Sequence, residues 1–315
     1  MTADKPPISR ATRQVLVLGS SGMAGHVVSK YLEERGREVT KVAGSYKSDP
    51  DTEVVDVTDR AHLDQILRSQ PYAAVVNCIG SLVKASERQH ARATYLNSYL
   101  PHYLEQAFCD SDTKVLHLST DCVFAGTNAP YVESDFRDGP AFYDRSKALG
   151  EIENGKDITL RMSLIGPEMR ESGTGLMHWF LGQSGEVRGF TGAIWNGITT
   201  LELAKAIDQL IDSELSGIYH LVPDHSISKF ALLGVIKDVF EREDILLMPD
   251  GSVSLDKTLV DTRKEVPFSV APRGYRGMIE DVRAWTGGHS RLYGSLPRYA
   301  SEAIAPGPEE VGGRD

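Results

Sequence analysis

The chain has 315 residues, of which 41% are hydrophobic, and this is enough to bury a large α/β core with a smaller attached unit. A formal net charge of -10 at pH 7 excludes broad binding to nucleic acids, whose phosphate backbone requires dense Lys and Arg. No apolar run is long enough to span a membrane or to form a signal peptide, and the three cysteines form no CxxC pair, which together favour a cytoplasmic protein with reduced thiols that binds no membrane.

Short apolar segments alternate with helix-length intervals through the first half of the chain. A strand is predicted at residues 14–18 and a helix at 23–34. Further strands are predicted at 38–42, 53–56, 73–78, 114–119 and 158–161. This alternation predicts an α/β fold with a Rossmann-like, doubly wound parallel sheet, whose ligand lies at the carboxyl ends of the strands.

The second half of the chain is less regular. Loops are expected over 166–192, followed by a helix at 201–211, a strand at 217–221 and a helix at 229–240. We therefore expect a smaller, mainly C-terminal substrate-binding region at 166–300, from which 195–222 returns to a nucleotide-binding domain at 14–165. Flexible tails are expected at 1–13 and 301–315.

A long helical segment is predicted at 87–108. It carries Tyr95, Tyr99 and Tyr103 at four-residue spacing, which places the three rings on one face of the helix. Such a stripe of tyrosines is typical of packing, either within the chain or across the two-fold axis of a homodimer.

The loop after the first predicted strand has the glycine spacing of a dinucleotide-binding turn. Glycine permits a tight turn and the close approach of a pyrophosphate, and the following helix start offers free N–H donors. The alternative is a plain strand-to-helix turn. The residues expected to bind the cofactor here are Gly19, Ser21, Gly22, Met23 and Gly25.

The end of the second predicted strand bears on the choice of cofactor. It has no carboxylate to bind the adenosine ribose of NAD. Ser45 and Lys47 can instead bind a 2′-phosphate, so NADP(H) is favoured over NAD(H), although Lys47 also suits a solvated loop. The residues at the ends of the next two strands are expected near the adenine and the ribose of the cofactor. The alternative is that they are ordinary strand ends. These residues are Asp56, Val57, Cys78, Ile79 and Gly80.

Tyr143 and Lys147 are four residues apart and therefore share one face of a predicted helix. A carbonyl that accepts a hydride must also receive a proton, and a tyrosine stabilised by a nearby ammonium can give it near neutral pH. Lys147 also suits the nicotinamide ribose. Thr120, at the end of the fifth strand, can bond the substrate carbonyl, or cap a turn together with Asp121.

Together with the glycine loop, three segments resemble the extended short-chain dehydrogenase/reductase superfamily, in its dTDP-4-dehydrorhamnose reductase-like branch. They are residues 119–126 (STDCVFAG), 143–151 (YDRSKALGE) and 160–166 (LRMSLIG). The resemblance implies Thr120, Tyr143 and Lys147 as catalytic residues. It also implies that NADPH or NADH reduces the 4-keto group of a nucleotide-linked 6-deoxy sugar. Some members of the family bind magnesium, but the sequence has no matching acidic cluster, so no metal site is expected.

Two departures leave the sugar and its nucleotide, dTDP or UDP, open. Cys122 stands where the rhamnose enzymes usually have an aromatic residue, and residues 190–199 (FTGAIWNGIT) resemble reductases of other sugars carried on UDP. A 4,6-dehydratase is disfavoured because Cys122 also replaces its glutamate base. The alternatives are an NAD-dependent nucleotide-sugar epimerase and a non-catalytic NADP-binding regulatory subunit.

Six further residues are expected to contact the nucleotide sugar. Arg161 can meet a diphosphate or a sugar hydroxyl, and it can equally pair with an internal carboxylate. Trp195 can stack on the sugar or base, or pack in the core, whereas His178 is expected to be a packing or surface residue. The six residues are Asp121, Val123, Phe124, Arg161, Trp195 and Asn196.

Overall fold

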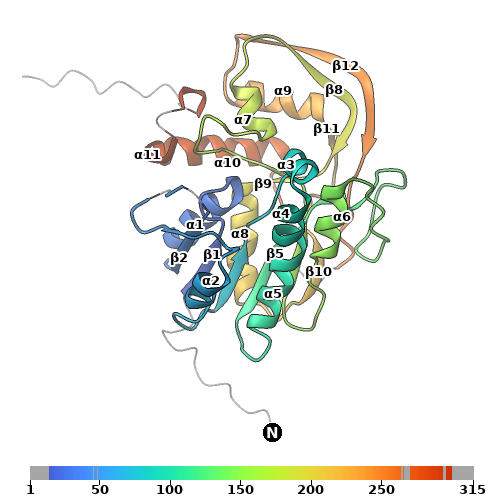
Figure 1. Ribbon diagram of the computed structural model, residues 1–315. Helices are drawn as coiled ribbons and strands as arrows, with labels where there is room; N and C mark the ends of the chain where they lie inside the picture. The colour runs from blue at the N-terminus through green and yellow to red at the C-terminus, as the bar shows by residue number, and fades with distance from the viewer. Residues whose placement is uncertain are drawn as a thin grey trace, which may run out of the picture.

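The computed structural model describes residues 14–44, 46–47, 49–263, 265, 270–293 and 296–299. Its main sheet has seven parallel strands in the order β10-β6-β5-β4-β1-β2-β3, flanked by helices (Figure 1). This confirms the predicted Rossmann-like fold. The strands are β1 (Gln14–Leu18), β2 (Glu38–Ala43), β3 (Glu53–Val54), β4 (Ala74–Asn77), β5 (Lys114–Leu118), β6 (Ile158–Arg161) and β10 (Gly217–His220).

The side chains of β1 explain why both faces of the sheet are covered. Val15 and Val17 join an apolar cluster with α1 (Met23–Glu34) and α8 (Thr200–Ile211). The alternating residues Leu16 and Leu18 join a second cluster with α2 (Arg60–Leu67) and α5 (Leu100–Ala107). A continuous apolar run is what a parallel strand needs when helices cover it on both sides.

The helix predicted over 87–108 is interrupted in the structure. It is divided into α3 (Val83–Arg88), α4 (His90–Thr94), a π-helical turn at Tyr95–Tyr99 and α5. Gln89 ends α3 because its φ of -135° and ψ of 68° are not helical. The backbone at Gly150 crosses the π-helical turn so closely that a Cβ there would lie 1.8 Å from the carbonyl oxygen of Asn97.

The three tyrosines of this segment pack within the chain. The rings of Tyr99 and Tyr103 stack with centroids 6.0 Å apart, and the Arg60 guanidinium of α2 lies 3.9 Å from the centroid of Tyr103. The Tyr95 hydroxyl donates to the carbonyl oxygen of Val57 at 2.8 Å. The stripe therefore joins this segment to α2, and a homodimer stays a prediction.

A three-stranded sheet lies beyond the carboxyl ends of the main-sheet strands (Figure 1). It is ordered β11-β8-β12 and is backed by α9 (Lys229–Val239). Its strands are β8 (Gly185–Trp195), β11 (Ile227–Ser228) and β12 (Ile245–Asp256). The loop predicted over 166–192 was therefore wrong at its end, because β8 already begins at Gly185. Gly189 permits this packing, since a Cβ there would lie 3.0 Å from the Cα of Phe230.

Smaller elements complete the described chain. The sequence analysis did not predict α10 (Gly274–Gly288), which packs against α8 and α9. The others are α6 (Phe142–Leu149), α7 (Leu176–Leu181), α11 (Ser290–Tyr293), the paired strands β7 (Leu164–Ile165) and β9 (Ile198–Thr199), and 3-10 turns at Asp121–Val123 and Pro297–Tyr299.

The predicted division of the chain at residue 165 stays a prediction. One cluster of buried apolar side chains extends from β1 to Tyr299 and so includes both predicted parts. Within the segment 195–222, β10 pairs with β6 in the main sheet. The predicted tails at 1–13 and 301–315 lie outside the described residues.

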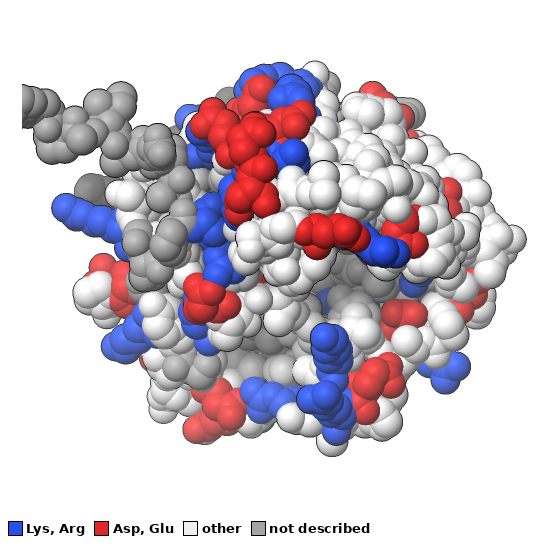
Figure 2. Space-filling model, turned by 90° about the horizontal axis from the view of Figure 1, so that it is seen from above, with Lys and Arg blue, Asp and Glu red and all other residues white. Residues whose placement is uncertain are grey.

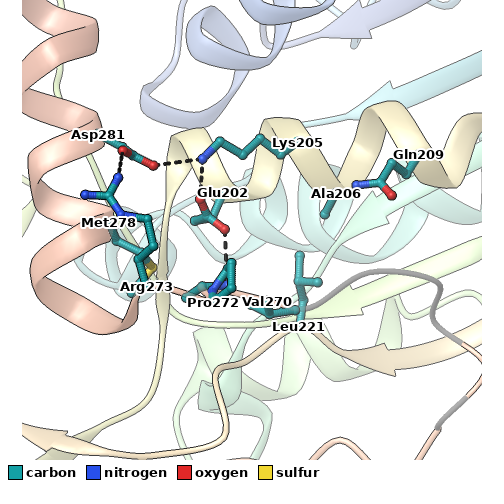
Figure 3. A pocket seen from close by; sticks show the side chains of 11 residues that line it. Glu202, Lys205, Ala206, Gln209, Leu221, Val270, Pro272, Arg273, Met278 and Asp281 are labelled. Atoms are coloured by element: carbon teal, nitrogen blue, oxygen red, sulfur yellow. Dashed lines mark hydrogen bonds and ion pairs between the residues drawn. The ribbon is translucent and has the colours of Figure 1, made fainter.

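A hollow of about 150 Å³ lies between α8 and α10 (Figure 3). None of the predicted site residues lines it. The Lys205 ammonium bonds Glu202 at 2.6 Å and Asp281 at 2.9 Å, and Asp281 also accepts from Arg273 at 2.6 Å. Because these charged side chains are paired with one another, we interpret the hollow as part of the packing contact between α8 and α10, which the ion pairs stabilise.

Candidate active site

The glycine loop is folded tightly against the start of α1. Gly19 has a φ of +81°, which favours glycine, and its N–H donates to the carbonyl oxygen of Val42 at 2.8 Å. A Cβ on Gly25 would lie 2.1 Å from the carbonyl oxygen of Gly19. Gly22 is the N-cap of α1 and provides no capping side chain, and no acidic residue stands in the first turn. The first N–H groups of α1 therefore form a site suited to an anion, flanked by the half-buried Ser21 and Met23.

The other predicted cofactor residues lie at the ends of neighbouring strands. Lys47 is exposed, and Ser45 lies outside the described residues. Cys78 and Ile79 are half-buried, Gly80 is exposed and Val57 is buried. Asp56 is exposed and accepts bonds from the N–H and hydroxyl of Thr58, which lower its pKa. That carboxylate therefore has the geometry of a turn.

One basic side chain near this edge was missed by the sequence analysis. The Arg170 guanidinium, from the loop after β7, lies 5.6 Å from the centroid of the Tyr46 ring. Tyr46 stands beside Lys47, after β2. The fold thus brings a second cation to the strand end where a 2′-phosphate was expected, a contact between residues far apart in the sequence.

The predicted catalytic residues meet at the carboxyl end of β5. Tyr143 and Lys147 lie one turn apart on α6, and the Tyr143 hydroxyl lies close enough to Thr120 for that side chain to lower its pKa. The Thr120 hydroxyl donates to Asp121 Oδ1 at 3.0 Å and accepts from the Cys122 N–H at 3.1 Å. Seen from above the second sheet, the surface is hollowed near the middle (Figure 2).

The charges around Tyr143 differ from the sequence-based expectation. Burial raises the pKa of Tyr143, and the neighbouring Cys122 and Asp121 raise it further. Lys147 does not offset this, and its Nζ donates to the carbonyl oxygen of Leu118 at 2.6 Å. Burial lowers the pKa of Lys147 to about 8. Tyr143 is therefore held as a neutral phenol, the form that donates a proton.

The structure corrects the expectation that Arg161 contacts the substrate. Arg161 is 1% exposed. Its Nε and Nη2 each donate to Glu151 at 2.8 Å, and its Nη1 donates to the carbonyl oxygen of Glu133 at 3.0 Å. Every nitrogen of this enclosed guanidinium therefore has an acceptor within the protein, which is the geometry of a structural ion pair.

Four more predicted substrate residues have side chains occupied within the protein. Val123 and Phe124 are fully buried, and Phe124 stacks on Tyr131 with centroids 4.2 Å apart. Trp195 is 5% exposed and packs against Tyr275. Asn196 binds both backbone groups of Leu259, at 2.6 and 3.1 Å. These four side chains are engaged in contacts within the protein, whereas Asp121 stays beside Thr120, with a pKa raised by burial.

Comparison with known proteins identifies the family. The family model described as the RmlD substrate binding domain matches residues 13–252. The probable low-salt glycan biosynthesis reductase Agl14 of Haloferax volcanii is 26% identical over 264 residues, which are 79% of this chain and 87% of that protein. The chain belongs to the RmlD family. This is the dTDP-4-dehydrorhamnose reductase family of NAD(P)-dependent oxidoreductases, within the extended short-chain dehydrogenases/reductases.

Two other proteins are similar to this RmlD-family chain. Methionine adenosyltransferase 2 subunit beta of Pongo abelii is 24% identical over 259 residues, 75% of each chain. The structure of dTDP-4-dehydrorhamnose reductase from Bacillus anthracis in complex with NADP superposes with a TM-score of 0.73 at 18% identity, covering 87% of this chain and 100% of that one. The first is a subunit by name, and the second, a reductase, shares the fold described above.

Two findings concern what the described part of this RmlD-family chain lacks. Within it, no His, Cys, Asp and Glu side chains gather in a group of three or more that could hold a metal ion. No helix in the same ranges combines the length and the apolar character needed to cross a membrane.

The sequence analysis also missed polar residues buried behind the predicted catalytic group. Asn97, in the π-helical turn, accepts from the Ser81 N–H at 2.7 Å and donates to the Ser146 hydroxyl at 2.9 Å. His117 lies on β5 and contacts Lys147. A histidine inside the apolar run 114–118 and an asparagine between the tyrosines were the available signals, since buried polar residues need partners.

Proposed function

We propose that this RmlD-family protein reduces the 4-keto group of a nucleotide-linked 6-deoxy sugar with NADPH. The observation that carries the proposal is the contact between Thr120 and Tyr143 at the end of β5, with Lys147 one helical turn away. The uncapped start of α1 lies at the same edge of the sheet. This is the arrangement that carbonyl reduction by hydride and proton transfer requires.

Each residue has a defined task in this proposal. Gly19, Gly22 and Gly25 would let the cofactor diphosphate approach the α1 N–H groups, and Lys147 would hold the nicotinamide ribose. The bound cofactor supplies the hydride. Tyr143, kept neutral by burial, gives its proton to the carbonyl oxygen. Thr120 can turn its hydroxyl from Asp121 toward the same oxygen and stabilise the charge that develops there.

The choice of nicotinamide cofactor is tested at Lys47. We expect Lys47→Glu to raise the KM for NADPH by about tenfold, because a charge-assisted bond to the 2′-phosphate would be lost and replaced by repulsion. The KM for NADH should change little. Steady-state rates with both cofactors measure this, with Lys237→Glu on α9 as the control. Equal effects on NADPH and NADH would contradict a role for Lys47 in binding the 2′-phosphate.

The reaction itself is tested with the purified protein alone. NADPH, then NADH, is mixed with dTDP- and UDP-linked 4-keto-6-deoxy sugars made in situ by a dehydratase, and loss of nicotinamide absorbance is followed. We expect oxidation with at least one sugar, which also names the nucleotide. Tight cofactor binding without oxidation of any member of the panel would count against the reductase.

A regulatory, non-catalytic subunit is the second candidate. It is favoured by the similarity to methionine adenosyltransferase 2 subunit beta over 75% of this chain. A nucleotide-sugar epimerase would instead retain NAD through purification, which absorbance of the denatured protein would detect. We further propose a cytoplasmic location, in keeping with the three free cysteines, and a homodimer, which light scattering tests.

A further inference from the structure

A chain of hydrogen bonds runs through the core behind Lys147. The Ile79 N–H donates to Asn77 Oδ1 at 3.2 Å, and Asn77 Nδ2 lies 3.2 Å from His117 Nδ1. His117 Nε2 lies 3.4 Å from Lys147 Nζ, and that Nζ donates to the carbonyl oxygen of Leu118 at 2.6 Å. Asn77 and His117 are 0% exposed and Lys147 is 4% exposed, so solvent offers none of them another partner.

The direction of this chain fixes where the protons lie. Because Asn77 Oδ1 accepts from a backbone N–H, the donating Nδ2 faces His117. His117 Nδ1 must then accept. A neutral imidazole has a single N–H, which is left on Nε2 and points at Lys147 Nζ. An ammonium has no lone pair to accept that N–H, whereas a neutral amine can accept it and still donate to Leu118.

We propose that His117, oriented by Asn77, is a positioning residue that favours the uncharged amine form of Lys147 before ligands bind. The assigned state of Lys147 follows from the hydrogen bonds alone, while its consequence for turnover rests on the proposed reductase function. A charged Lys147 would have to donate to His117 Nε2, which reverses the direction of these hydrogen bonds. The reversal requires the other His117 tautomer and a flip of the Asn77 amide. The flip turns the amide NH₂ toward the Ile79 N–H and loses that bond.

The titratable groups around Lys147 agree with this state. Burial is the main cause that lowers the pKa of His117 well below its usual range, so the imidazole stays neutral. Burial raises the pKa of the Cys78 thiol to about 12, so it contributes no thiolate. Glu151 is the carboxylate that favours an ammonium here, but it is already paired with Arg161 and Arg137.

Two more groups face this site from helices. Tyr143, on α6, is a neutral phenol because burial raises its pKa. His102, on α5, acts on His117 through its charge and bonds Glu105 at 2.9 Å. Neither contributes an anion beside Lys147. As the pH rises through the lowered pKa of Lys147, near 8, the amine form is reached well below the usual range for lysine.

The tautomer of His117 is the direct test. In protein labelled with ¹⁵N-histidine and free of cofactor and substrate, long-range ¹H–¹⁵N correlation spectra distinguish a proton on Nε2 from one on Nδ1. His117→Gln identifies the signal by its loss. We expect the proton on Nε2 at pH 9, above the lowered pKa of Lys147. A proton on Nδ1, or a doubly protonated ring, would overturn the proposal, and this result does not depend on any enzymatic activity.

A variant tests the effect on Lys147. In His117→Gln the amide can turn its oxygen toward Nζ and accept from an ammonium, so the pKa of Lys147 should rise, by about one pH unit. Titration of ¹³C-labelled lysine, assigned with Lys147→Met, measures this without substrate. The control is His62→Gln on α2, a half-buried histidine that bonds Glu53, and this change should leave the titration unchanged. An unchanged Lys147 titration in His117→Gln would contradict the proposal.

Kinetics supply a second readout. If the reductase is confirmed, the limb of the kcat/KM profile that reports Lys147 should move to higher pH in His117→Gln by the same amount as the titration. A variant that loses rate equally at every pH would show a merely structural role and would overturn the proposal. If no substrate is reduced, the proposed function fails while the tautomer and titration still decide this inference. If His117→Gln does not fold, the histidine signal that shifts in Lys147→Met assigns His117 in the wild type instead.

Discussion

Replacing Tyr143 with phenylalanine is expected to lower kcat by about 10²- to 10⁴-fold while leaving NADPH affinity unchanged. The ring keeps its packing on α6, but the proton that the carbonyl oxygen needs is removed together with the contact to Thr120. Initial rates with the sugar identified by the panel measure kcat. Quenching of protein fluorescence by NADPH measures cofactor affinity separately.

The matched control is Tyr99→Phe. Tyr99 is 43% exposed on the π-helical turn and packs against Tyr103 and Arg60, away from Thr120. Its loss should leave kcat within experimental error. Full turnover in Tyr143→Phe would remove Tyr143 as the proton donor, and loss of NADPH binding in that variant would point to a structural defect. A regulatory subunit would lose no function through this substitution.

The main sheet could be predicted because its signals are local. Residues 14–18 read as a strand covered on both faces, and Val15 and Leu16 do face different helix layers. The second sheet was hidden because β8 contains Gly185, Gly189 and Gly192, which indicate loops in isolation. The close contact of Gly189 with Phe230 on α9 explains that glycine, and this contact joins residues 41 positions apart.

The candidate site shows the same division. The spacing of Tyr143 and Lys147 predicted one helix face, because helical periodicity is local. The state of Lys147 could not be predicted, since it depends on β5 residues that α6 meets only in the folded chain. For both Arg161 and Trp195, the sequence allowed either packing inside the protein or contact with the substrate. The partners that decide for packing are Glu151 for Arg161 and Tyr275 for Trp195, and the sequence analysis did not recognise either pair.

Glu151→Ala is expected to lower the free energy of unfolding by about 3–5 kcal/mol, because it leaves a buried guanidinium uncompensated. Glu151 accepts from Arg161, from Arg137 at 2.9 Å and from the Ser119 hydroxyl at 2.6 Å. Urea unfolding followed by circular dichroism measures the change. The control is Asp238→Ala, which breaks an exposed pair with Arg276 and should have little effect.

The same carboxylate predicts how stability depends on pH. Burial tends to raise the pKa of Glu151, but the bonds from Arg161, Ser119 and Arg137 hold it below its ordinary value. The unfolded chain therefore binds the proton more readily, so this stabilisation is complete above about pH 4.3 and is lost as the pH falls through the folded pKa. Glu151→Ala should flatten the acid side of the stability profile. An unchanged profile would show that Glu151 is not the group that titrates.

Arg161 is then tested in a background where its charge no longer needs a partner. In Glu151→Leu combined with Arg161→Met, both members of the buried pair are apolar, so part of the stability lost in Glu151→Ala should return. A double variant that folds keeps Tyr143, Thr120 and Lys147 in place, and its KM for the sugar nucleotide should match the wild type. If that KM rose strongly and nothing else changed, Arg161 would contact the substrate after all, contrary to what its enclosed guanidinium indicates.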